Sequence, residues 1–414
     1  MGIEILRRLW DAPPDLLPSQ FLDNRIYTNA RIFDAEQERI FSRIWKFACH
    51  ESELPNLGDY RVVPLGGKSV FLVRGADGVV RAFLNACPHR GAQLLRDSAG
   101  TLSDQRIQCF YHHWTFSTQG ECLFIPRPEG YAGTSICREN IALRAVRTET
   151  VLGLVFFSLD CEAGPLSEFL GTTLEGLREP LADLEVLHYH RVEIKANWKL
   201  FVETNCEGYH ELLHLLNRST GLSQPAYRAR QWHMHPHGHH TFAPAQIAYG
   251  RLALGERASA TLPGMAPNGH RVADLFPDAM INVRATVVRI DSLIPLGPGL
   301  TVLECRGLGR KDDSPETREL RTKHHNQVWG PFGRNLPEDI WAVETQWANM
   351  SSGASRYSII ARQEGNQAMD DAPLRSFYTE WRRHLERCTH DIDAAYKAPD
   401  AAQTELQDVR QQPA

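Results

Sequence analysis

Two short segments, Cys87-Pro-His89 and Cys109-Phe-Tyr-His112, constrain this chain more than any other feature of its sequence. Nineteen residues separate the first histidine from the second cysteine. Each segment offers one sulfur and one ring nitrogen, which are common ligand atoms for transition metals. Two hairpin-like loops that share one metal centre must lie side by side. The first prediction is therefore a metal-binding domain built from short strands.

The ligand types on each loop distinguish a structural zinc site from an iron–sulfur cluster. Structural zinc sites usually keep like ligands together, with C-x-x-C on one loop and H-x-x-x-H on another. In a Rieske [2Fe–2S] cluster, one iron takes two thiolates and the other takes two imidazoles, which raises the reduction potential. Each loop here mixes one Cys with one His. The pattern favours the Rieske cluster, with zinc as the alternative.

The length and composition of the chain limit its class. A chain of 414 residues has room for a second, larger domain. The net charge of −5 offers no general surface for nucleic acid, and no apolar run approaches the roughly 20 residues of a membrane span. The N-terminal residues lack the apolar core of a signal peptide, and nine cysteines at irregular spacing indicate reduced thiols. We expect a cytoplasmic, soluble protein.

Hydrophobic periodicity divides the chain into three parts: 1–45, an extended arm and a helix; 46–157, a small all-β domain; and 158–414, a larger α+β domain. Helices are predicted at 34–45, 166–184, 197–217, 316–328, 336–349 and 378–388. In the third part, strands are predicted at 188–195, 279–294 and 300–308.

A second metal site is predicted in the sequence Glu207-Gly-Tyr-His210-Glu-Leu-Leu-His214. Two imidazoles four residues apart share one face of a helix and can bind one metal. H-E-L-L-H also matches a zinc hydrolase motif with Glu211 as the base, and a polar helix face is the simplest alternative. A one-electron cluster upstream needs an acceptor. Two His and one carboxylate on Fe(II) leave open positions for dioxygen.

With these motifs, and with His89-Arg90-Gly91 and His112-His113-Trp114, the chain resembles the large subunits of Rieske ring-hydroxylating oxygenases from about residue 25 to 385. The resemblance implies a Rieske domain followed by an α+β helix-grip catalytic domain, with helices on an antiparallel sheet. It also implies a [2Fe–2S] cluster and a mononuclear non-heme Fe(II). The cluster ligands would be Cys87, His89, Cys109 and His112.

The resemblance also supplies a third iron ligand. The family's acidic pair followed by Gln matches Glu338-Asp339 and Gln346, so Asp339 is the expected carboxylate, with Glu338 and Glu344 as alternatives. Glu207 stands where relatives carry an acid, usually Asp, that joins the cluster His of a neighbouring subunit to an iron-site His. The chain departs from the family in having three residues instead of four between His210 and His214.

The implied activity is that of a terminal oxygenase. Electrons from NAD(P)H would arrive through a separate reductase, with or without a ferredoxin, because the chain has no G-x-G-x-x-G fingerprint at a strand–helix junction. Family members assemble as trimers, alone or with a small β subunit as α3β3. The N-terminal half resembles the anthranilate, ortho-halobenzoate, salicylate and terephthalate oxygenases. This similarity makes an aromatic acid, anthranilate or another ortho-substituted benzoate, the expected substrate.

Three charged residues of the predicted strand 279–294 are candidates for recognising such a substrate: Arg284, Arg289 and Asp291. The last two share a face by alternation, so an internal ion pair is an equal interpretation. A segment with five histidines, residues 233–240, is interrupted by Pro236 and Gly238 and is interpreted as a loop or edge near the active-site mouth. Two other functions are alternatives: a zinc hydrolase and an electron carrier without catalysis.

Overall fold

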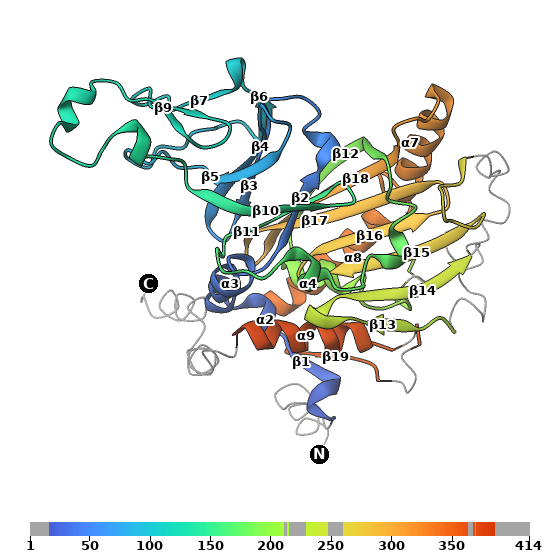
Figure 1. Cartoon of the computed structure of the whole chain (residues 1–414). Coiled ribbons are helices and arrows are strands. Elements are labelled where there is room, and N and C mark those ends of the chain that lie inside the picture. The colour runs from blue at the N-terminus through green and yellow to red at the C-terminus, as the bar shows by residue number, and fades with distance from the viewer. Residues whose placement is uncertain are drawn as a thin grey trace, which may run out of the picture.

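The computed structural model describes residues 16–210, 213–214, 229–246, 260–362, 367–368 and 370–385. Two antiparallel β structures dominate the ribbon, one at the upper left of Figure 1 and one at the right. A short sheet of β1 (Phe21–Asp23) and β19 (Tyr357–Ile359) joins the N-terminal arm to the C-terminal part of the chain. No helix among the described residues is long and apolar enough to cross a membrane.

The N-terminal domain combines a seven-stranded sheet with a three-stranded one. The larger sheet runs in the order β2 (Lys46–His50), β11 (Leu154–Ser158), β10 (Ala145–Val151), β5 (Val80–Leu84), β4 (Lys68–Arg74), β3 (Asp59–Leu65) and β6 (Ala99–Thr101). The smaller sheet contains β7 (Arg106–Gln108), β8 (Thr115–Ser117) and β9 (Cys122–Phe124). The end that carries β7 and β9 points away from the other domain (Figure 1).

The C-terminal domain is built on a second seven-stranded antiparallel sheet. Its order is β12 (Leu184–Ile194), β18 (Leu300–Arg310), β17 (Val287–Gly297), β16 (Ala279–Arg284), β15 (Gly269–Leu275), β14 (His240–Gln246) and β13 (Trp232–Met234). Side chains alternate between its faces. Ile281 and Val283 of β16 pack in one cluster with Phe47 and Leu154 of the N-terminal domain. Asn282 and Arg284 face the other way, into a pocket.

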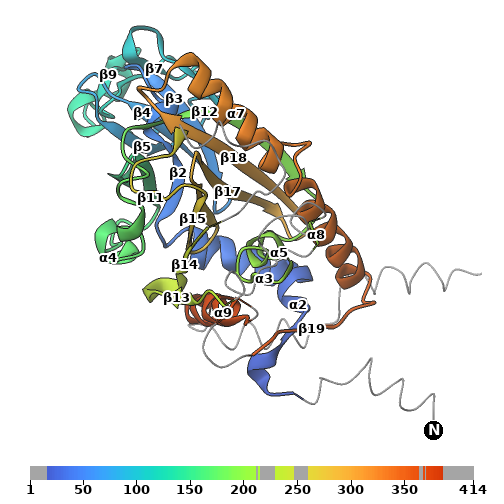
Figure 2. The ribbon, with the colours of Figure 1, turned by 90° about the vertical axis from the view of Figure 1, so that its right-hand side faces the viewer.

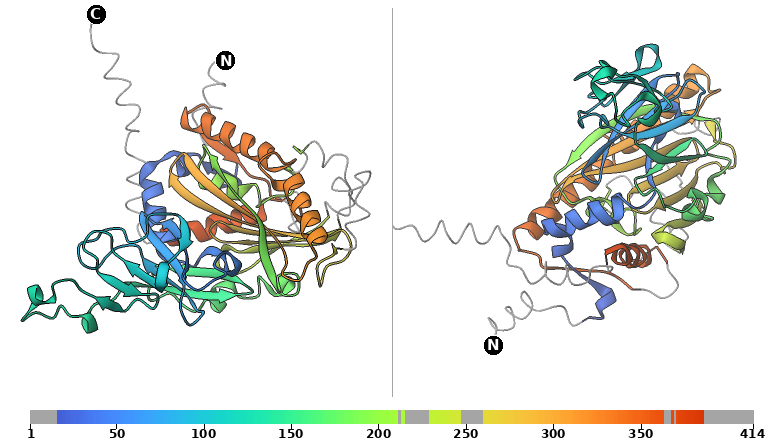
Figure 3. Two further views of the ribbon diagram at one scale, coloured as in Figure 1. Left: turned by 90° about the horizontal axis from the view of Figure 1, so that it is seen from above. Right: turned by 60° about the vertical axis from the view of Figure 1, so that its left-hand side comes forward.

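Helices cover the pocket side of this sheet. Figure 2 shows α7 (Pro315–Trp329) along β17 and β18, followed by α8 (Leu336–Ser351), which contacts α5 (Trp198–Glu203). The left panel of Figure 3 places α7 and α8 on the side of the sheet away from the N-terminal domain. The other α-helices of the described residues are α2 (Arg25–Thr28), α3 (Ala30–Glu36), α4 (Leu166–Leu170) and α9 (Ala372–Leu385). This is the helix-grip arrangement that the resemblance implies.

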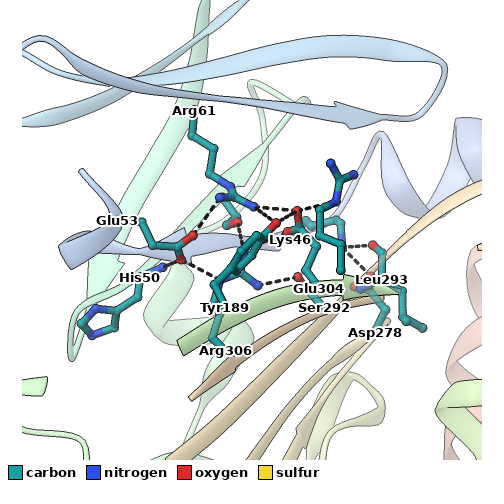
Figure 4. Close-up of polar contacts among 12 residues, drawn as sticks. Lys46, His50, Glu53, Arg61, Tyr189, Asp278, Ser292, Leu293, Glu304 and Arg306 are labelled. Atoms are coloured by element: carbon teal, nitrogen blue, oxygen red, sulfur yellow. Dashed lines mark hydrogen bonds and ion pairs between the residues drawn. The ribbon is translucent and has the colours of Figure 1, made fainter. Parts of the chain in front are cut away.

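A buried ionic network joins the two domains (Figure 4). Arg306 of β18 donates to Glu53 Oε1 at 2.6 Å and to Glu304 Oε2 at 2.8 Å. Arg61 of β3 reaches the same two carboxylates, at 2.9 Å and 2.6 Å. Burial alone would raise the pKa of Glu304, but the two guanidinium groups outweigh it and lower that pKa to about 2. Because both cations contact both carboxylates, the network fixes one domain against the other.

Several predicted elements differ from the structure. The helix expected over 34–45 begins earlier, at Ala30, where the Asn29 side chain caps it, and continues as a π-helical turn over Gln37–Phe41. The strand expected over 279–294 is two antiparallel strands, β16 and β17, which reverse at Ala285 and Thr286. No Gly or Pro marks that turn. The connector 166–184 is only α4 and a 3-10 turn, Glu175–Leu177.

The helix expected over 197–217 ends at Glu203. Thr204 and Asn205 form turns on the carbonyl groups of Phe201 and Val202. Gly208 then donates its N–H to the Ala368 carbonyl at 3.1 Å, and a Cβ at this position would lie 3.1 Å from that oxygen. This close backbone approach takes the chain off the helix axis. Residues 211–212 and 215–217 lie outside the described residues.

Candidate metal centres

The two loops with the Cys–His pairs have the same backbone structure. The N–H groups of Cys87 and Cys109 donate to the carbonyl groups five residues later, Ala92 and Trp114, at 2.8 Å each. The two cysteine carbonyls each accept from the residue four positions later. That fourth residue has positive φ in both loops, 76° at Gly91 and 57° at His113. The matched loops place both thiols in the core, with 3% and 1% of each cysteine exposed.

The two imidazoles of these loops lie against each other and against aromatic rings. The ring centroids of His89 and His112 are 4.6 Å apart. His89 stacks on Trp114 at 4.7 Å, and its Nε2 atom lies 3.2 Å from the Tyr131 hydroxyl. That contact leaves Nδ1 of His89 for a metal. Phe110 and Tyr111, beside the second pair, are half-exposed.

The thiol pair fits a group that takes sulfur and nitrogen separately. Burial raises the pKa of the Cys87 thiol to about 11, and backbone N–H groups of His89 and Arg90 oppose this by donating to the sulfur. A buried thiol with that pKa ionises at neutral pH only when a metal binds it. Two buried sulfurs beneath two partly exposed imidazoles are the donor set of a Rieske cluster.

The second candidate centre joins His210 and His214 to the first turn of α8. Asp339 Oδ1 lies 3.6 Å from His210 Nε2 and 3.3 Å from His214 Nε2. Ligand atoms of the three residues all lie within 4.8 Å of one another. Asp339 Oδ1 is buried and has no hydrogen-bond donor among the residues that the structure describes. The two imidazoles and the carboxylate could hold one metal ion.

Two further carboxylates hold the outer edges of these imidazoles. Glu207 Oε1 lies 2.6 Å from His210 Nδ1, and Glu338 Oε2 lies 2.8 Å from His214 Nδ1. A carboxylate beside Nδ1 keeps the proton on that nitrogen and leaves the Nε2 lone pair for a metal. Both Nε2 atoms therefore point toward Asp339 as electron donors.

The charge balance of the group favours a divalent cation. Burial raises the pKa of Asp339, while His210, His214 and Arg289 act in the opposite direction. A bound cation would stabilise the ionised carboxylate. Two neutral imidazoles with one carboxylate are the donor set of non-heme Fe(II), and they leave coordination positions open.

Several predictions change in detail. His210 and His214 do not sit on one regular helix: Glu207 accepts N–H bonds from Tyr209 at 2.6 Å and His210 at 2.9 Å, and thereby starts a new turn. Glu338 contacts an imidazole from outside rather than joining Asp339. Glu344 accepts the Lys195 N–H at 2.8 Å. The Glu211 base of the zinc hydrolase alternative lies outside the described residues.

A pocket of about 630 Å³, including its open mouth, adjoins the His–His–Asp group. Its lining includes the three aromatic residues Trp232, Phe242 and Trp329 and the two arginines Arg284 and Arg289. Arg289 and Asp291 pair side by side, with Nε 2.9 Å from Oδ1, so the ion-pair interpretation of these two residues is confirmed. Trp329 was not singled out from sequence, because an aromatic residue at helical spacing reads as core.

The histidine-rich segment is the edge of the catalytic sheet, as expected: β13, a 3-10 turn at Pro236–Gly238, and the start of β14. His239 is fully buried, and its Nε2 atom lies 2.8 Å from the Phe169 carbonyl. His240 Nε2 lies 3.1 Å from Asp274 Oδ2, a carboxylate that the sequence did not place nearby. Among the described residues, these histidines do not gather into a metal-binding group.

Comparisons with known proteins agree with both centres. Residues 44–140 match the Rieske [2Fe-2S] domain, and residues 181–387 match the ring hydroxylating alpha subunit catalytic domain. The chain is 40% identical to the 2-aminobenzenesulfonate 2,3-dioxygenase subunit alpha of Alcaligenes sp, over 92% of this chain and 97% of that one. It is 38% identical to the methanesulfonate monooxygenase hydroxylase subunit alpha of Methylosulfonomonas methylovora, over 95% and 98%.

Among solved structures, naphthalene 1,2-dioxygenase from Rhodococcus sp. bound to indole has the same fold, with a TM-score of 0.75 and 22% identity over 88% of this chain and 94% of that one. The chain belongs to the ring-hydroxylating oxygenase alpha subunits. It is an oxidoreductase of the Rieske type, whose cofactors are a [2Fe–2S] cluster and a mononuclear non-heme iron. Alpha subunits of this family oligomerise and work with a reductase.

Proposed function

We propose that the chain is a terminal oxygenase that hydroxylates a small ring compound carrying an acidic group. The favoured substrates are anthranilate, or another ortho-substituted benzoate, and the matching benzenesulfonates. The observation that carries this proposal is the 40% identical relative, whose named substrate, 2-aminobenzenesulfonate, is anthranilate with a sulfonate in place of the carboxylate. A second relative is named for another sulfonate. Salicylate- and terephthalate-type substrates are the alternatives.

In this proposal, Cys87, His89, Cys109 and His112 hold the cluster, and His210, His214 and Asp339 hold the iron. When bound, the two groups supply electrons and the activation of dioxygen. The chain's own residues prepare the site. Glu207 and Glu338 hold protons on the two Nδ1 atoms, which fixes the imidazoles for binding through Nε2. The aromatic residues of the pocket exclude water around the ring of the substrate.

The proposed assembly is a trimer, with or without a β subunit, in which each cluster serves the iron of another copy. Its support is the position of the cluster loops at the end of the N-terminal domain that points away from the catalytic sheet (Figure 1). Glu207 would then join the neighbour's cluster to His210. Glu207→Gln should slow reduction of the iron without removing either metal; unchanged single-turnover rates would refute this role. The molar mass of the purified oligomer separates α3 from α3β3.

We propose a cytoplasmic location, because the reductase would draw on NAD(P)H. None of the eight cysteines that the structure describes forms a disulfide, which suits a reducing compartment.

The test is turnover by the purified holoenzyme with a family reductase on a panel of anthranilate, 2-aminobenzenesulfonate, salicylate and terephthalate. Labelled dioxygen and mass spectrometry report whether one or two oxygen atoms enter the product. We expect NADH oxidation coupled to product formation with anthranilate or 2-aminobenzenesulfonate. Turnover confined to neutral rings or to non-aromatic compounds would contradict it. Aniline is the matched neutral compound.

A further inference from the structure

We propose that His240 and Asp274 form a subsite that accepts hydrogen bonds from an amino group on the substrate ring. The ligand chemistry is an uncharged N–H donor beside the acidic group of the substrate. The inference rests on the proposed function and adds the substituent by which the enzyme selects its substrate.

A second pocket adjoins the one beside the His–His–Asp group. It has a volume of about 360 Å³, including its open mouth, and both pockets have Asn205 and Met280 in their linings. Its polar side chains include the three carboxylates Asp274, Asp278 and Asp291, and the described residues of its lining include no Lys or Arg. Such a lining repels an anion and suits a hydrogen-bond donor.

Sheet register brings the subsite residues together on one face of the catalytic sheet. His240 of β14 pairs with Asp274 of β15, which pairs in turn with Met280 of β16. Met280 then pairs with Asp291 of β17. Directly paired residues point their side chains to the same face of a sheet, so these four side chains form one row along the pocket wall.

The contacts of His240 determine which of its ring nitrogens carries the hydrogen. Its Nε2 atom lies 3.5 Å from the Asn205 carbonyl oxygen and 3.1 Å from Asp274 Oδ2. A carbonyl oxygen can only accept, so the hydrogen of the neutral ring sits on Nε2, and Nδ1 keeps a lone pair. His240 is only 2% exposed, and Nδ1 has no hydrogen-bond partner among the residues that the structure describes. A buried acceptor without a partner costs free energy, so Nδ1 marks the place of a ligand N–H group.

The neighbouring His239 has the opposite arrangement. Its Nδ1 atom accepts from the Phe276 N–H at 2.9 Å, and its Nε2 atom lies 2.8 Å from the Phe169 carbonyl oxygen. The fold therefore uses both nitrogens of His239. Adjacent residues of an extended chain point to opposite faces, and of these two histidines only His240 lines the pocket. The unused nitrogen thus belongs to the histidine that a substrate can reach.

The three carboxylates of the pocket differ in their partners. Arg289 pairs with Asp291, and Lys46 pairs with Asp278. Among the described residues, the ion-pair partner of Asp274 is the imidazole beside it, and not an Arg or a Lys. Burial raises the pKa of Asp274, and a hydrogen bond from a ligand N–H group stabilises the ionised carboxylate. Asp274 and the unused ring nitrogen therefore offer two neighbouring acceptors to one amino group.

The test is binding to the oxidised holoenzyme, which has no electron supply and cannot turn over. Calorimetric titrations compare compounds in which a methyl group replaces the amino group: anthranilate with 2-methylbenzoate, 2-aminobenzenesulfonate with 2-methylbenzenesulfonate, and aniline with toluene. The two groups are similar in size, so the affinity ratio of each pair measures the hydrogen bonds of the amino group. In the wild type, the amino compound of each pair should bind about 10-fold more tightly.

His240→Leu should remove most of this preference and leave the affinity for the methyl compounds unchanged. Asp274→Asn should also lower the ratio, because a neutral amide is a weaker acceptor than a carboxylate. The matched control is His233→Ala, which removes an exposed histidine of β13 and should keep the wild-type ratio. The cluster spectrum and melting temperature verify folding, and Asp274→Asn replaces His240→Leu if that variant does not fold.

Equal affinities for the amino and methyl compounds in the wild type would overturn the subsite, and so would a wild-type ratio in either folded variant. The proposed function fails separately, if the wild-type enzyme turns over none of the acidic substrates. Aniline and toluene distinguish the two failures, because neither compound carries an acidic group.

Discussion

The cluster loops and the iron site both hold imidazoles in one orientation for a metal, but they position these rings by different means. In the cluster domain, all four expected ligands come from residues 87–112, on two loops with matching backbone hydrogen bonds. In the catalytic domain, His210 and His214 follow a broken helix, and Asp339 comes from α8, more than a hundred residues later. One site is local and the other is assembled by the fold.

The two sites also orient their rings differently. A neutral hydroxyl, that of Tyr131, lies at the outer nitrogen of His89. Carboxylates lie at the outer nitrogens of His210 and His214. A carboxylate raises the basicity of the ring more than a hydroxyl does. Binding of the mononuclear iron should therefore depend strongly on outer carboxylates, whereas the cluster depends on its thiolates.

The largest effect is expected at the cluster. Cys109→Ser should abolish the visible spectrum, acid-labile sulfide and turnover, because serine does not replace a thiolate on the cluster iron. Iron at the second site should remain. Cys122→Ser is the matched control: Cys122 is a buried thiol of the same domain, and its Sγ donates to the Phe124 carbonyl. If both variants lost the visible spectrum, the loss in Cys109→Ser could not be assigned to a missing cluster ligand.

The next effect is expected at the iron site. His214→Ala should retain the cluster spectrum and lose product formation by at least about 100-fold, because one of the expected metal ligands is gone. His235→Ala removes a histidine of the edge segment and should be neutral. If His214→Ala formed product at the wild-type rate, the reaction would have to occur at a site other than the His–His–Asp group.

A smaller effect is expected from the outer carboxylates. Glu338→Gln should weaken iron binding by about 10- to 100-fold, measured by chelator competition, because a neutral amide is a weaker acceptor than a carboxylate for the Nδ1 proton of His214. Glu344→Gln, on the same helix, is the control. Tyr131→Phe should leave the cluster loaded. Equal metal loss in the Glu338 and Tyr131 variants would remove the distinction between the two sites.

The same distinction explains what sequence could predict. The Cys–His loops were predictable because local spacing alone sets their geometry, and the strands around them alternate plainly. The iron site needed the resemblance for Asp339, because nothing local links it to His214. The helix break after Glu203 was missed, since it depends on the contact between Gly208 and Ala368. Glu338 was a candidate ligand, and only packing shows that it faces the outer nitrogen of His214. Asp274 shares no motif with His240, and only the sheet register pairs the two residues.

The smallest effect concerns stability and not catalysis. Burial raises the pKa of Glu203 to about 7, although the Tyr27 and Tyr378 hydroxyls and Lys199 oppose it. The folded state then holds a proton that the unfolded state releases at about pH 4.5, so stability falls as pH rises from about 4.5 through 7. Glu203→Gln should remove this dependence, worth about 3 kcal/mol, in urea unfolding at a series of pH values. A wild-type profile that matches the variant would contradict it.

We infer that this chain holds a second, separate iron through His210, His214 and Asp339. Mössbauer spectra of ⁵⁷Fe-loaded wild-type and Asp339→Ala holoenzyme test this inference. The variant should lose one high-spin ferrous signal, one iron atom per chain, while both cluster irons and the sulfide content stay unchanged. If the variant kept that ferrous signal, or lost it together with the cluster signals, Asp339 would not be a ligand of a separate iron.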